Sequence, residues 1–248
     1  MGIFDKLFGK DKSEDSKKFS FQVARSVKKI TNPNQQPAER KFAIQSLAQL
    51  GTDEAAKALV LRFGMRAEQS IVDEEEKKMA ADALIGMGEK SIAPVQEFIR
   101  HETSLYWPIR TLAGIIGKET TVDFLLQEIE DCEAIFERDV LRKMELISNL
   151  NQFDDTRVPD TLKKVLDEEE NEEIKARAIE GLGDIADKDM IKYFIDRLVN
   201  PRETQRIRNV LLQIAVDKKW KMKYRRDEIK PLLPATYWID DVGIIRRK

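Results

Sequence analysis

The chain has 248 residues, of which 42% are hydrophobic and 35% are charged, and its formal net charge is −2. This near balance excludes a global field that would draw the chain to nucleic acid or anionic lipid. The single cysteine, Cys132, excludes an internal disulfide. The sequence has no apolar run of about 18 residues, which argues against a membrane span, so we expect a cytoplasmic protein.

Residues 1–20 are predicted to be a short amphipathic segment followed by a polar tether. Four apolar side chains fall on one face of a helix, and they are Ile3, Phe4, Leu7 and Phe8. We expect this stripe to dock weakly on a membrane surface, on a partner's groove or on the body of the protein. The alternative is a disordered start, because the stretch KDKSEDSKKFS that follows is polar and charged.

A helical hairpin recurs along residues 37–219, after a capping helix expected at residues 21–30. Each unit has an apolar helix, an anchor residue, a short polar break and a second apolar helix. The anchors are Gly51, Gly88, Gly117, Asp154, Ala186 and Lys219, spaced 29–37 residues apart. Glycine suits the left-handed conformation that ends a helix, and Thr52 is placed to cap the next helix. The pattern predicts about six stacked hairpins over residues 21–219.

Apolar columns keep register with the anchors and define the inner face of each helix. Four residues before the anchor stand Leu47, Leu84, Ala113, Leu150, Leu182 and Ala215. Eight residues after it stand Leu59, Leu125, Leu162 and Phe194. A basic column eleven residues before the anchor contains Arg40, Lys77, Lys143, Lys175 and Arg208. These basic side chains either bridge to the neighbouring repeat or belong to a solvated face.

The segment EIKARAIEGLGDIADKDMIKYFIDRL, which begins at Glu173, gives the clearest copy of the repeat. It resembles the HEAT-like repeats of bacterial proteins related to phycobilisome lyases. The resemblance implies an all-α, right-handed solenoid. It implies little about activity, because this fold hosts many functions.

The C-terminal stretch changes in charge: residues 201–248 hold 13 Lys and Arg against 6 Asp and Glu. Residues 220–248 are predicted to be a basic cap, with a small hairpin formed by TYWIDDVGIIRRK. A patch of Trp220, Lys221, Tyr224 and Arg225 has two interpretations. Its aromatic rings stack on nucleic-acid bases, or they pack inward and seal the stack, which we favour because terminal repeats need a polar outer face.

The sequence has few side chains that could form a catalytic or metal-binding site. His101 is the only histidine and has no serine or metal-ligand pattern around it, while the acidic neighbours of Cys132 disfavour a thiolate. The sequence contains no phosphate-binding glycine loop. We therefore expect a protein without catalytic activity, cofactor or metal.

The best candidate for a binding surface is the concave face, which we expect the second helices to line. Its outward residues are Lys57, Arg62, Glu97, Arg100, Gln127, Glu130, Lys163, Lys164, Asp167, Lys192 and Asp196. Both signs of charge alternate along this ridge, which favours a protein partner over a polyanion. The predicted function is a protein-binding scaffold. The alternatives are nucleic-acid binding, as in DNA glycosylases of HEAT-like fold, and a lyase-type accessory factor.

Overall fold

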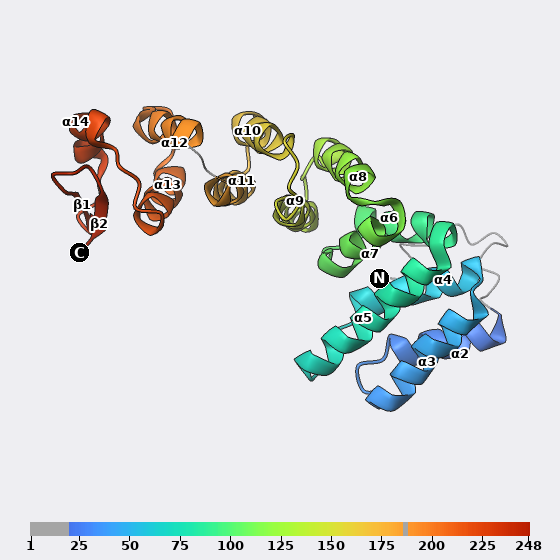
Figure 1. Ribbon diagram of the computed structural model, residues 1–248. Helices are drawn as coiled ribbons and strands as arrows, with labels where there is room; N and C mark the ends of the chain where they lie inside the picture. The colour runs from blue at the N-terminus through green and yellow to red at the C-terminus, as the bar shows by residue number, and fades with distance from the viewer. Residues whose placement is uncertain (1–19, 186–187) are drawn as a thin grey trace. The chain divides into compact units, whose positions relative to one another are not determined.

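The computed structural model of the chain describes residues 20–185 and 188–248. These residues are predominantly α-helical, with two strands of three residues each, so the predicted all-α class is confirmed (Figure 1). Two expectations fall outside the described residues. They are the apolar stripe formed by Ile3, Phe4, Leu7 and Phe8, and the anchor at Ala186.

Two compact units make up the chain, and each is described by itself. The helices of unit 1, which ends at Phe153, are α2 (Phe21–Ile30), α3 (Pro37–Leu50), α4 (Asp53–Leu59), α5 (Ser70–Met87), α6 (Ile92–His101), α7 (Tyr106–Ile116), α8 (Lys118–Asp131) and α9 (Glu137–Leu150), with 3₁₀ turns η1 (Val60–Gly64) and η2 (Gly88–Ser91). Unit 2 (Asp154–Lys248) contains α10 (Val158–Glu168), α11 (Glu172–Asp184), α12 (Lys188–Val199), α13 (Gln205–Asp217), η3 (Lys223–Arg225), α14 (Arg226–Ile229), η4 (Lys230–Leu232), β1 (Tyr237–Ile239) and β2 (Ile245–Arg247).

The anchor positions end the first helix of several hairpins as predicted. Gly51, which follows α3, has a φ of 59° and a ψ of 24°, the left-handed conformation that glycine adopts without strain. Lys219 follows α13 and also has a positive φ, of 52°, although it is not a glycine. Thr52 caps α4 by accepting a hydrogen bond of 3.2 Å from the N–H of Ala55.

The apolar columns form the core of each unit. Leu47, Leu84, Leu150 and Leu182 are fully buried, as are Leu59, Leu125 and Leu162 of the second helices. Ala113 departs from its column because it is only half-buried. Each buried leucine contributes roughly 2 kcal/mol through removal of apolar surface from water.

The first helices of the first three hairpins pack closely on one another. In unit 1, α3 packs on α5 and α5 on α7, whereas α4 and α6 touch little, as do α7 and α9. In unit 2, α11 packs on α13. The expectation that the second helices line the concave face stays a prediction.

The basic column divides between two roles. Arg40 of α3 bridges to the next hairpin, because its Nε donates to both carboxylate oxygens of Glu76 in α5 at 2.8 and 3.1 Å. Lys143 and Arg208 instead donate to the carbonyl oxygens of Cys132 and Asn200 at 2.9 and 2.8 Å. Those carbonyls lie just beyond the ends of α8 and α12, where helices leave acceptors unpaired.

An antiparallel hairpin ends the chain, with β1 paired to β2 so that Trp238 lies opposite Arg246. The turn that precedes β2 contains Gly243, which has a φ of 83°. A Cβ at Gly243 would lie 2.3 Å from the backbone nitrogen of Lys223. Only glycine therefore allows this close approach between the hairpin and η3.

Candidate functional site

The predicted ridge lies on the second helices of the hairpins. Most of its side chains are exposed, and these are Lys57, Arg100, Gln127, Glu130, Lys164, Asp167, Lys192 and Asp196. Glu97 and Lys163 are half-buried. The ridge residues are therefore at the surface, with Arg62 as the exception.

Arg62 was wrongly placed on this surface, because its side chain is 0% exposed. The prediction assumed that the second helix continues past Leu59, but α4 ends there and the tighter turn of η1 directs Arg62 inward. Its guanidinium donates to the carbonyl of Met65 at 2.8 Å and lies 2.7 Å from a carboxylate oxygen of Asp73.

Arg62 belongs to a buried charge network in unit 1. The members of the network are Arg40, Arg62, Asp73, Glu76 and Lys77. Glu76 pairs with both arginines, at 2.8 and 2.9 Å, and Lys77 lies 2.7 Å from Asp73. Burial acts to raise the pKa of Asp73, but hydrogen bonds from Lys77, the Ala67 N–H and Arg62 together lower that pKa below its ordinary value.

Charges on the second-helix ridge largely pair with one another. Arg100 lies 2.9 Å from Glu128 and also over the ring of Phe124, 5.2 Å from its centroid. Glu97 lies 2.8 Å from the ring nitrogen of His101. Asp196 in unit 2 accepts from Arg225 at 2.7 Å. A ridge whose charges already have partners offers few of them to another protein.

The outward face of the first helices in unit 1 is different, because it carries large apolar side chains. Phe42 of α3 and Ile71 of α5 are 66% and 74% exposed. Tyr106 of α7 and Leu141 of α9 are exposed as well. Among the described residues, the second helices α4, α6, α8, α10 and α12 expose no large hydrophobic side chain. We call the surface formed by Phe42, Ile71, Tyr106, Trp107 and Leu141 the apolar face.

A hollow of about 420 Å³ lies in the apolar face between α5 and α7. Ile71 and Trp107 form its apolar walls, and the Trp107 Nε1 donates to Glu74 at 2.8 Å. Glu75 at its rim pairs with Lys41 of α3 at 2.7 Å. An apolar centre with a charged rim is the usual composition of a protein-binding surface.

The sequence analysis missed the apolar face because it followed the columns that point inward. Phe42 directly precedes the buried Ala43, so the two lie about 100° apart around α3. Large apolar residues at helical positions outside the buried columns were the available signal.

In the structure, one residue of the C-terminal patch is buried and the other three lie nearer the surface. Trp220 is buried and stacks on Phe194 of α12, with ring centroids 5.1 Å apart, as expected of a cap. Tyr224 was expected to pack inward with it, but its side chain is exposed. Arg225 pairs with Asp196 and with Glu228, so its charge is partly neutralised. Lys221 is exposed and forms a β-bridge with Ile244.

None of the helices within residues 20–185 and 188–248 has the length and apolar composition needed to cross a bilayer. The same residues contain no group of three or more metal-ligating side chains placed to hold an ion. No protein-family model matches the sequence, and comparison with curated proteins finds no match.

Proposed function

We propose that the protein is a non-catalytic scaffold that binds another protein through the apolar face of unit 1. The observation that carries the proposal is that the first helices of unit 1 expose Phe42, Ile71, Tyr106 and Leu141, and that Ile71 and Trp107 share one hollow. Leaving such side chains in water costs about 1.5–3 kcal/mol each relative to burial. Exposed apolar patches with a polar rim usually mark interaction sites.

The composition of the apolar face supports a protein partner. Tyr106 and Trp107 pack edge to face at 5.5 Å, and Arg110 lies over the Tyr106 ring, 4.6 Å from its centroid. Tryptophan, tyrosine and arginine contribute most of the binding energy in many interfaces. Their mutual packing also reduces the side-chain entropy that association would otherwise remove.

Two alternatives have less support. A nucleic-acid site at the C-terminal end needs free aromatic rings beside free cations. Tyr224 and Lys221 are exposed there, but Trp220 is buried and Arg225 is paired, so only half of the patch could serve such a site. A lyase-type accessory role stays a hypothesis based on the resemblance of the repeats alone. Neither alternative accounts for the exposed aromatic and aliphatic side chains of unit 1.

Site-specific photo-crosslinking in cells tests the proposal. A photoreactive phenylalanine analogue replaces Phe42 or Tyr106 on the apolar face, and matched controls carry it at Lys57 or Gln127 on exposed second helices. We expect discrete crosslinks to a different protein from the first two positions only. Crosslinks from the control positions alone, or only to a second copy of this chain, would contradict the proposal.

A further inference from the structure

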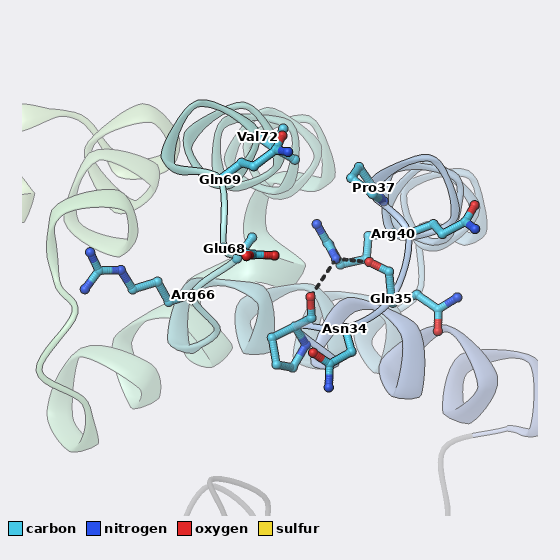
Figure 2. A pocket seen from close by; sticks show the side chains of 11 residues that line it. Asn34, Gln35, Pro37, Arg40, Arg66, Glu68, Gln69 and Val72 are labelled. Carbon is cyan, nitrogen blue, oxygen red and sulfur yellow. Dashed lines mark hydrogen bonds between the residues drawn. The ribbon is translucent and has the colours of Figure 1, made fainter.

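A second hollow in unit 1, of about 750 Å³, shares no lining residue with the apolar face (Figure 2). Residues of the loop before α3 and of the loop before α5 line it, together with Arg40. Its volume is that of a small-molecule site. The lining is polar: it includes the amide side chains of Asn34, Gln35 and Gln69 and the charged side chains of Arg66 and Glu68.

Arg40 is held rigidly at the inner wall of this hollow. The residue is only 2% exposed, and its Nε is bound to the carboxylate of Glu76. Its Nη1 donates to the carbonyl oxygens of Pro33 and Gln35, the bonds dashed in Figure 2. Its Nη2 donates to no described residue. One nitrogen of a nearly buried guanidinium is therefore left without an acceptor, at the wall of a polar hollow.

The buried network behind Arg40 carries an excess of positive charge. It contains three cations, Arg40, Arg62 and Lys77, and two carboxylates, Asp73 and Glu76. The five groups together have a charge of +1. An uncompensated buried charge is unfavourable, so an anion beside Arg40 would be stabilised by the network as a whole.

Two helix N-termini add to the positive potential at the hollow. Gln36 and Gln69 occupy the N-cap positions of α3 and α5, and neither side chain makes a capping hydrogen bond. The start of α5 therefore keeps its partial positive charge for another acceptor, whereas α3 offers less, because Pro37 has no N–H and the Glu39 N–H donates to the Gln36 carbonyl at 3.0 Å. Both glutamines line the hollow.

We propose that this hollow binds the phosphate group of a small polar molecule, such as a phosphate monoester. The free Nη2 of Arg40 and the start of α5 lie at the hollow, and the exposed Arg66 lies at its rim, where its guanidinium extends away from Arg40 in Figure 2 and has to turn toward a bound anion. A tetrahedral phosphate has three terminal oxygens to receive these groups, whereas a planar carboxylate has two. The side-chain amides of Asn34 and Gln35 also line the hollow and can hydrogen-bond the rest of the ligand.

Glu68 provides a matched control, because removing its charge should change the phosphate affinity in the direction opposite to removing Arg66. Its exposed carboxylate lines the same hollow and forms no ion pair with a described residue. Like charge near the bound phosphate weakens binding, so Glu68→Gln should strengthen it, by about threefold. Arg66→Ala removes an exposed cation and should weaken binding about ten- to a hundredfold.

The test is calorimetric titration of the full chain with glycerol 3-phosphate and inorganic phosphate, with glycerol and acetate as controls. We expect saturable binding of both phosphates in the millimolar range or tighter, with opposite effects of Arg66→Ala and Glu68→Gln, and neither variant should change the melting temperature. Absence of saturable phosphate binding would overturn the proposal. So would acetate binding as tight as phosphate binding, or phosphate binding that Arg66→Ala leaves unchanged.

Discussion

The two units use the same hairpin with different interiors and different surfaces. Every buried polar or charged side chain among the described residues lies in unit 1, including the network around Glu76. The described interior of unit 2 is apolar and ends on the stacked pair of Phe194 and Trp220. The comparison teaches that a repeat pattern specifies helix pairs without specifying what holds them together.

The surfaces of the first helices differ in the same way. In unit 1 the first helices expose Phe42, Ile71 and Tyr106. In unit 2 the corresponding helices α11 and α13 carry ion pairs, such as Arg206 with Glu173 at 3.2 Å. A solvated face of paired charges needs no partner, and an apolar face does. The comparison therefore favours unit 1 as the place of the proposed binding surface.

The largest expected effect comes from removing the carboxylate at the centre of the unit 1 network. Glu76→Ala leaves Arg40 and Arg62 buried without their shared partner and should destabilise unit 1 by about 3–5 kcal/mol. The control is Glu180→Ala in unit 2, where an exposed pair with Arg177 contributes about 0–1 kcal/mol. Denaturant unfolding measures both, and a loss below about 1 kcal/mol for Glu76→Ala would refute the role of the network.

Two buried leucines, one in each unit, allow a test of whether a destabilising substitution affects only its own unit. Leu150 of α9 and Leu182 of α11 are both fully buried. Each leucine-to-alanine change should cost about 2–5 kcal/mol through the cavity that it leaves. Amide hydrogen exchange should show faster exchange in the unit that carries the change. Equal acceleration in both units after either substitution would mean that they unfold as one.

Acid should weaken unit 1 through Asp73. Because the folded state lowers the pKa of Asp73, its ionised form stabilises the fold above the unfolded value of 3.8, and this contribution is lost as the pH falls through the lower folded pKa. Asp73→Asn should remove this pH dependence and reduce stability at neutral pH. The control Asp217→Asn changes an exposed residue of unit 2. If Asp73→Asn kept the wild-type acid profile, the assignment to Asp73 would be wrong.

The smallest effect on stability is expected on the apolar face. Phe42→Ser and Ile71→Ser change exposed side chains and should alter the free energy of unfolding by less than about 0.5 kcal/mol. The same changes should abolish photo-crosslinking from Tyr106. A loss of more than about 2 kcal/mol would show that these side chains stabilise the fold instead of contacting a partner.

The anchors and apolar columns made the helical fold predictable, because helix periodicity and glycine conformation act locally. The inner position of Leu182 follows from its spacing to neighbouring apolar residues. Which helices of different hairpins pack closely on one another does not follow, because that depends on side chains far apart in the sequence. The burial of Arg62 was equally hidden, since it required both the end of α4 and acceptors from Asp73 and Glu76.

If a partner covers the apolar face in cells, its side chains should be protected there, whereas the exposed side chains of unit 2 should not. Hydroxyl-radical footprinting measures this protection for each side chain, by comparing oxidation in intact cells with oxidation of the purified chain. We predict that Phe42, Tyr106 and Trp107 are oxidised several-fold less in cells, while the exposed Tyr224 and Trp238 of unit 2 are unchanged. Equal oxidation of the apolar face in cells and in isolation would contradict its assignment as the partner-binding surface.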